Sequence, residues 1–128
     1  MAIDGGFIWP VGGNGGYVSE VLYGYSGHTG IDIATDAGTQ VFAAADGVVT
    51  YAATRGSYGK LIIVAHSNGY VTYYAHCRYI GVTAGQTVSQ GDFIGEVGMT
   101  GNATGNHLHF EVRTTNGDVL NPIDYVER

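Results

Sequence analysis

The chain has 128 residues, a net charge of −6 and only 12% charged residues, with 22 glycines and 10 tyrosines. This length suits one domain, which would bury roughly two thirds of its unfolded surface. The negative charge argues against a nucleic-acid partner, which would need a basic stripe, and no apolar run is long enough to span a membrane. The single cysteine, Cys77, rules out an internal disulfide framework. The first residues lack the basic and apolar segments of a signal peptide.

The N-terminal part is predicted to be extended. Residues 1–16 are rich in glycine around Phe7-Ile8-Trp9-Pro10, which indicates an entry segment with Trp9 as a partly buried anchor. Residues 17–25 alternate weakly and are predicted to form a strand, with Tyr23 and Tyr25 on one face. We therefore divide the chain into an entry segment, 1–16, and a single domain, 17–128.

Two Asn-Gly pairs predict β-hairpins. The first, Asn68-Gly69, lies between two β-rich runs, 60–66 and 70–76, so that His76 would end the second strand. The second, Asn116-Gly117, follows a predicted strand over 107–115. Asn-Gly is typical of a type I′ turn, which needs a positive φ at both central residues.

The remaining pattern also favours strands. Two segments, 38–49 and 85–97, each contain a turn glycine, a valine and an Asp followed or preceded by Gly, as expected for short crossing strands. No helical periodicity of useful length is present. The prediction is an all-β fold of compact antiparallel sheets with short crossing strands and little or no helix.

A pair of histidines near the C-terminus is the strongest chemical signal. His107 and His109 stand at i and i+2, so a strand directs both imidazoles to one face, while Leu108 and Phe110 point into a core. Of the other histidines, His66 is expected to be structural. Cys77 alternates to the face opposite His76 and is expected to be a buried free thiol.

His28 and Asp32 form a second group of metal-competent side chains. A fully extended chain would separate them by about 13 Å, but a bend at Thr29-Gly30 would let them share an ion. Catalytic zinc takes three protein ligands of His or carboxylate type and leaves one position for water. His28, Asp32 and one of His107 or His109 meet that count. The unused histidine and His76 would then handle protons or stabilise an oxyanion.

These motifs together resemble the lysostaphin-type zinc endopeptidases, the M23 or LytM-like peptidases. The resemblance rests on His28-Thr-Gly-Ile-Asp32, Tyr74-Ala-His76 and His107-Leu-His109-Phe, and it extends from Trp9-Pro10 to Leu120-Asn121-Pro122. It implies a fold of the duplicated-hybrid-motif type and one Zn²⁺ per chain.

By this resemblance His28, Asp32 and His109 would hold the zinc, and His76 and His107 would be the catalytic pair. It also implies a substrate in the peptide part of bacterial peptidoglycan, cut at a stem or cross-bridge bond. A monomeric domain acting at the cell wall, extracellular, periplasmic or delivered by a phage particle, is expected.

The substrate groove is less well marked. Glycine-lined walls would suit a slim substrate, and Tyr23, Tyr25 and Tyr74 are predicted to line the groove. Many family members carry an Arg shortly after the Tyr-Gly that precedes the first His, and the segment after Tyr23-Gly24 has none.

Two alternatives compete with the enzyme. One is a catalytically silent LytM-like domain that binds cell wall or activates an amidase partner; such domains characteristically lose ligands or catalytic histidines, which this chain retains. The other is a lipoyl- or biotinyl-like carrier domain. A carrier needs a lysine at a hairpin tip, whereas the single lysine, Lys60, begins an apolar strand.

Overall fold

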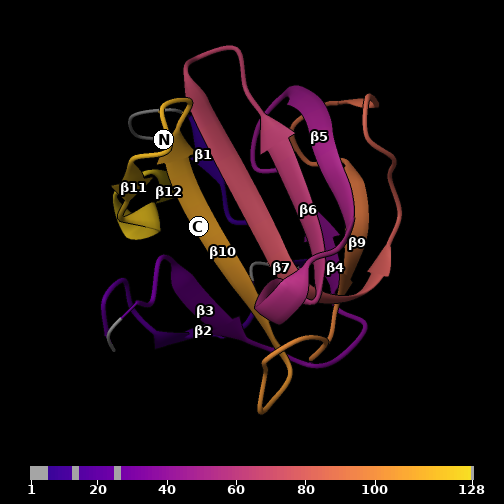
Figure 1. The fold of residues 1–128 in the computed structure, drawn as a ribbon, viewed down its shortest axis with the longest axis vertical. Helices are drawn as coiled ribbons and strands as arrows, with labels where there is room; N and C mark the ends of the chain where they lie inside the picture. Colours follow the sequence, from indigo (N-terminus) through magenta and orange to yellow (C-terminus); the bar gives the residue numbers. More distant parts are fainter. Residues whose placement is uncertain (1–5, 13–14, 25–26, 128) are drawn as a thin grey trace.

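The computed structural model describes residues 6–12, 15–24 and 27–127, and this part of the chain is built almost entirely from short strands (Figure 1). The strands are β1 (Phe7–Ile8), β2 (Tyr17–Glu20), β3 (Ile31–Ala34), β4 (Gln40–Phe42), β5 (Gly47–Thr54), β6 (Lys60–Ala65), β7 (Tyr70–Ile80), β8 (Thr87–Val88), β9 (Phe93–Val97), β10 (His107–Thr114), β11 (Val119–Leu120) and β12 (Val126–Glu127). Two 3-10 turns, η2 (Gly56–Tyr58) and η3 (Pro122–Asp124), interrupt them. In the described ranges we find no helix with the length and apolar character that crossing a bilayer requires.

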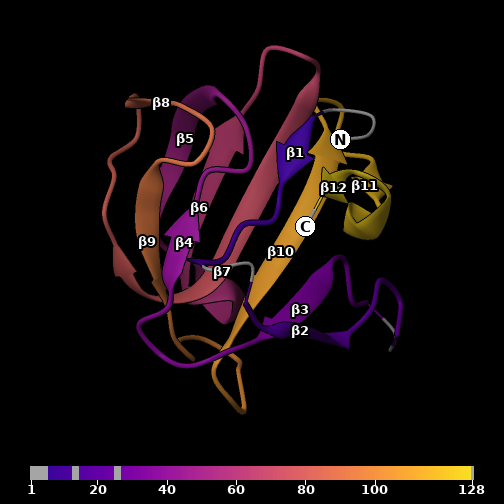
Figure 2. The same ribbon diagram turned by 180° about the vertical axis from the view of Figure 1, so that it is seen from behind.

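One large antiparallel sheet dominates the fold. Its strands run in the order β2-β3-β10-β7-β6-β5-β8, with β11 added to β10 and the pair β9-β4 added to the end of β7. The sheet folds back on itself, so that β4 and β9 lie behind β5 and β6 in Figure 1 and in front of them in Figure 2. A separate parallel pair joins β1 to β12. The prediction of an all-β fold built from antiparallel sheets is confirmed.

The main core lies on one face of β3, β10 and β7. Alternation along β10 buries Leu108 and Phe110 completely, and β3 contributes Ile31 and Ile33 to the same cluster. Each such side chain gains about 1.5–3 kcal/mol from burial. The same alternation places Asp32 and His109 on the opposite face, so their side chains are not part of this core.

Both predicted hairpins form, but the expected turn type is wrong. β6 pairs with β7 across Asn68-Gly69, and β10 pairs with β11 across Asn116-Gly117. Only the glycines have positive φ, at 87° for Gly69 and 90° for Gly117, while neither asparagine does. A three-residue loop that ends in one left-handed glycine explains this geometry, because it needs a positive φ at that position alone.

β7 is longer than predicted and bends where it was expected to end. It continues to Ile80, and His76 has a φ of 64°, a left-handed conformation that is uncommon for a residue with a side chain. A regular strand would send His76 to the face of Tyr74, inside the core. The bend reverses the alternation and turns the imidazole to the other face.

The N-terminal part pairs with the C-terminal end of the chain and with β3. Strand β2 ends at Glu20 instead of residue 25, and Tyr25 lies outside the described residues. In the predicted entry segment, β1 pairs with β12. Trp9 is more deeply buried than expected, at 6% exposure, and its indole N–H donates to the Gly15 carbonyl.

Candidate metal centre

Two neighbouring strands and one bend bring three ligand atoms together. In the β3–β10 pair Asp32 lies directly opposite His109, so both side chains leave the sheet on the same face. His28 arrives from the bend before β3. At Gly30 a Cβ would collide with the Phe110 carbonyl, so only glycine allows the bend to pass this close to β10. One ligand atom each from His28, Asp32 and His109 lies within 4.8 Å of the others.

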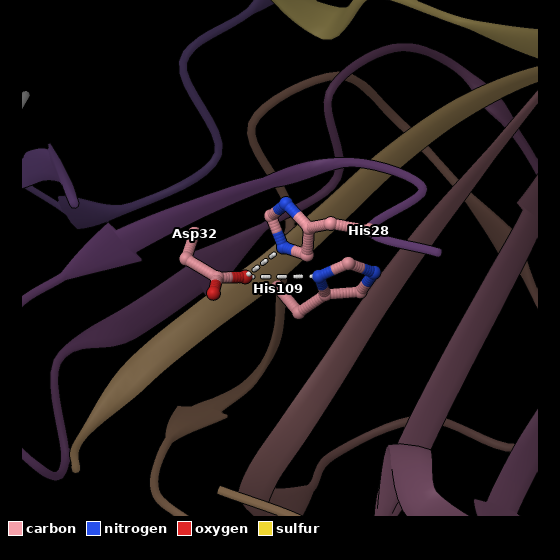
Figure 3. A group of neighbouring side chains, drawn as sticks. All are labelled: His28, Asp32 and His109. Atoms are coloured by element: carbon pink, nitrogen blue, oxygen red, sulfur yellow. Dashed lines mark hydrogen bonds and ion pairs between the residues drawn. The ribbon is translucent and has the colours of Figure 1, made fainter. Parts of the chain in front are cut away.

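The hydrogen bonds of the two imidazoles leave their remaining nitrogens facing one carboxylate oxygen (Figure 3). Nδ1–H of His28 donates to the Val21 carbonyl at 2.7 Å, so Nε2 turns its lone pair toward Oδ1 of Asp32 at 3.0 Å. Nε2–H of His109 donates to Oε2 of Glu111 at 2.7 Å, which leaves Nδ1 2.9 Å from the same Asp32 oxygen.

Two nitrogen lone pairs and a carboxylate oxygen repel one another unless a positive charge lies among them. That charge is either an added proton on a ring or a metal ion. Two imidazoles and a carboxylate are a donor set that zinc accepts, with room for a fourth ligand. The residues present therefore fit the metal.

The pKa values show what these contacts do in the absence of a metal. Burial alone would lower the pKa of His109, but hydrogen bonds to Asp32 and Glu111 outweigh it and raise the pKa to about 9. Burial would raise the pKa of Asp32, but its contacts with the rings of His109 and His28 lower it. Without a metal, the His109 ring thus holds a second proton on Nδ1, the atom that would bind the metal. Metal binding would release that proton.

Glu111 hydrogen-bonds to Nε2 of His109, the ring nitrogen that points away from Asp32. It was not among the site residues predicted from the sequence. Its carboxylate is fully buried and accepts from Nε2–H of His109, from the Thr29 hydroxyl at 2.7 Å, from the Tyr58 hydroxyl at 2.9 Å and from Nε–H of Arg113 at 2.6 Å. Despite burial, these donors lower the pKa of Glu111 to about 2. Burial and the adjacent Glu111 charge raise the pKa of Tyr58 to about 12. Partners of this kind fix the tautomer and orientation of a ligating histidine.

Two more imidazoles lie at the edge of the three ligands. Nδ1–H of His76 donates to the Thr100 carbonyl at 2.7 Å, and Nδ1–H of His107 donates to the Gly105 carbonyl at 2.9 Å. The two ring centroids are 4.8 Å apart, and Nε2 of His107 is 3.6 Å from Oδ2 of Asp32. Burial lowers the pKa of His76, partly offset by the Thr100 hydrogen bond. The structure thus brings together all five residues, four histidines and Asp32, that the sequence assigned to the site.

A cavity of about 820 Å³ opens over this group. Its walls come from Ser19 and Glu20 at the end of β2, from Ser57 and Tyr58 in η2, and from residues 102–106 before β10. This last loop projects at the lower end of β10 in both ribbon views. Ala103 and Gly105 give this wall of the cavity two residues with little or no side chain.

The three tyrosines predicted to line the groove have different outcomes. Tyr74 is fully buried in the core, where its hydroxyl accepts from the Ala44 backbone N–H at 2.9 Å, so its prediction is wrong. Tyr23 is 63% exposed, and its backbone N–H donates to the His28 carbonyl. It does not border the cavity and stays a prediction. Tyr25 falls outside the described residues.

The other two residues singled out behave as structural groups. Nδ1–H of His66 donates to the Asp46 carbonyl at 2.7 Å, and its Nε2 lies 2.9 Å from the Thr72 hydroxyl. Cys77 is a buried free cysteine.

Comparison with known proteins gives the same family from sequence and from structure. The model of the family described as Peptidase family M23 matches residues 26–122. The DD-carboxypeptidase/endopeptidase Mpg of Neisseria meningitidis serogroup B is 45% identical over 103 residues, which are 80% of this chain and 24% of that protein. The lipoprotein NlpD/LppB homolog of Pseudomonas aeruginosa is 40% identical over 126 residues, which are 97% of this chain and 41% of that protein.

Among solved structures, a putative peptidase M23 from Pseudomonas aeruginosa has a TM-score of 0.80 at 31% identity, covering 97% of this chain and 51% of that chain. The catalytic domain of lysostaphin from Staphylococcus simulans has a TM-score of 0.73 at 28% identity, covering 84% and 87%. The chain spans less than half the length of the Mpg peptidase and of the NlpD/LppB homolog. It belongs to the peptidase M23 family.

Proposed function

We propose that this chain is a zinc-dependent endopeptidase that hydrolyses peptide bonds in the stem or cross-bridge of bacterial peptidoglycan. The observation that carries the proposal is the convergence of Nε2 of His28, Oδ1 of Asp32 and Nδ1 of His109, with His76 and His107 beside them. Relatives named as peptidoglycan DD-endopeptidases support the substrate, among them ShyA of Vibrio cholerae, 42% identical over 85 residues, 66% of this chain and 20% of that protein.

The three ligands would hold the zinc and leave one position open toward the cavity. Zinc in such a site lowers the pKa of a water molecule and polarises a carbonyl group. Glu111 would keep Nδ1 of His109 directed at the ion, since it accepts the proton of the other ring nitrogen.

The other two histidines of the site, His76 and His107, would transfer a proton and stabilise the developing negative charge, respectively. Because Nδ1–H of His76 is committed to the Thr100 carbonyl, the neutral ring has its lone pair on Nε2. We assign this nitrogen as the base that accepts a proton from the attacking water and passes it to the leaving amine. In its protonated form His107 would donate from Nε2 to the carbonyl oxygen as negative charge develops there.

A direct test is digestion of purified peptidoglycans that differ in cross-bridge chemistry, with the fragments identified by mass. We expect zinc-loaded protein to release peptide fragments from at least one of them, and chelation to abolish the release. Such a digest also shows which bond is cut. Absence of cleavage of every peptidoglycan by protein with full zinc content would contradict the proposal.

A second candidate is a catalytically silent domain that binds cell wall or activates an amidase partner. Two relatives favour it because their names state no peptidase activity: the NlpD/LppB homolog, and the cell division protein DipM of Caulobacter vibrioides, 37% identical over 127 residues. The same digestion separates the candidates. Protein that sediments with peptidoglycan but releases no fragment would support the silent domain.

A further inference from the structure

The cavity wall carries one carboxylate that the proposed reaction does not use. Glu20, the last residue of β2, lies opposite Asp32 in the β2–β3 pair and borders the cavity. Residues opposite each other in an antiparallel pair have Cβ atoms about 4.5–5.5 Å apart and side chains on one face. Glu20 therefore flanks the predicted metal centre on the side of β2.

Glu20 has no positively charged protein partner in the part of the chain that the structure describes. No ion pair of Glu20 is found there, and none of the described residues that border the cavity is a lysine or arginine. The carboxylate lies over Gly24, where an added Cβ would collide with Oε1, so the glycine preserves the space that it occupies. A partly exposed carboxylate that has no cationic partner among the described residues is open to a ligand cation, which would form charge-assisted hydrogen bonds with it.

The position also separates Glu20 from the metal ligands. The set of ligand atoms that lie close enough to share an ion comprises His28, Asp32 and His109, and Glu20 is not a member. Its carboxylate is thus available to a bound molecule rather than to the ion.

We propose that Glu20 forms an ammonium-binding subsite of this cavity and favours peptides that carry a primary amine close to the scissile bond. The inference rests on the proposed function, since it specifies the substrate of the same site. The ammonium is either an α-amine or the side-chain amine of a basic residue, and both would donate charge-assisted hydrogen bonds to the carboxylate. One cross-strand spacing from Asp32 corresponds to about one or two residues of extended peptide.

The test uses cross-linked stem peptides in matched pairs that differ only in acetylation of one amine. In one pair the amine is N-terminal, and in the other it is on a side chain. For zinc-loaded wild type we expect kcat/KM to be about tenfold higher for the free amine than for the acetylated peptide, in the pair whose amine reaches Glu20. In Glu20→Gln that ratio should fall to about one. Glu96→Gln, which removes a carboxylate from outside the cavity, should keep the wild-type ratio.

Three results would overturn the subsite: equal rates for both members of both pairs in wild type, an unchanged ratio in Glu20→Gln, or loss of zinc from Glu20→Gln. Calorimetric dissociation constants for the same peptides make the test independent of catalysis. If no peptide is cleaved, the proposed function fails, while the binding ratios still decide the subsite: a preference for the free amine that Glu20→Gln abolishes supports it, and equal binding overturns it.

Discussion

Two histidines of this protein are equally buried but lie in opposite chemical surroundings. His66 and His109 are each 6% exposed. His66 faces a carbonyl and a hydroxyl, which satisfy a neutral ring, and burial lowers its pKa. His109 faces a carboxylate at each ring nitrogen, and these raise its pKa to about 9. Burial alone therefore does not separate a structural histidine from a proposed metal ligand; the charge of its partners does.

The difference also shows where the fold needs a cation. Around His66 both ring nitrogens face uncharged groups, a carbonyl and a hydroxyl, so the neutral ring needs no added charge. Around His109 the carboxylates of Asp32 and Glu111 attract positive charge from both sides, and the lone pairs of His28 and His109 converge on one Asp32 oxygen. The first cluster stabilises the sheet, whereas the second is complete only with a proton or a metal ion.

Removing the negative charge of Glu111, the hydrogen-bond partner of His109, should weaken metal binding strongly. In Glu111→Gln the amide supplies a poorer acceptor for Nε2–H of His109, so we expect the zinc dissociation constant to rise about 10- to 100-fold. Competition with a chromogenic chelator measures it. Tyr58→Phe removes one of the other hydrogen bonds to Glu111 and should have a smaller effect in the same direction. Wild-type zinc affinity in Glu111→Gln would contradict the role given to this residue.

The bend that delivers His28 can be tested through its glycine. Gly30→Ala would force a Cβ against the Phe110 carbonyl, and such overpacking costs about 1–3 kcal/mol of unfolding free energy. Gly105→Ala is the matched control, because a Cβ there meets nothing within 4 Å. Urea unfolding of the zinc-free proteins checks both. Equal destabilisation by the two substitutions would argue against a tight approach of the bend to β10.

The His66 cluster predicts a smaller, pH-dependent effect. The folded pKa of His66 lies below its ordinary value near 6.5, so the unfolded chain binds more protons as the pH falls through that value. The stability of zinc-free wild type should therefore fall, relative to His66→Gln, as the pH drops below about 6.5. Above this value the difference between the two should be constant. Urea unfolding at a series of pH values measures it, and parallel curves across the range would refute the neutral, structural assignment.

The sequence predicts much of this arrangement because strands alternate regularly. The i, i+2 spacing of His107 and His109 predicts their common face, and Leu108 and Phe110 enter the core as expected. The same rule extended by two residues would have placed Glu111 beside the histidines. The signal for the support of His109 was therefore present in the sequence, although its partner Tyr58 arrives from a distant turn that no local pattern indicates.

The predictions for Tyr74 and for the two hairpin turns failed because of local backbone conformation. Tyr74 and His76 stand at i and i+2, so alternation predicts one common face for both. The φ of 64° at His76 breaks the alternation, and Tyr74 stays in the core while His76 borders the cavity. Likewise, each Asn-Gly pair correctly predicted a hairpin but did not predict the length of its loop. A single left-handed residue is set by the packing around it, which a one-dimensional pattern does not contain.

His109 and His107 lie two residues apart on one strand, and we assign them different functions. Zinc content and peptidoglycan cleavage, measured together on His109→Ala and His107→Ala after dialysis against metal-free buffer, test this most directly. We predict that His109→Ala retains neither zinc nor activity, and that His107→Ala keeps wild-type zinc content but loses activity. Equal zinc loss in both variants, or zinc retention by His109→Ala, would contradict the assignment.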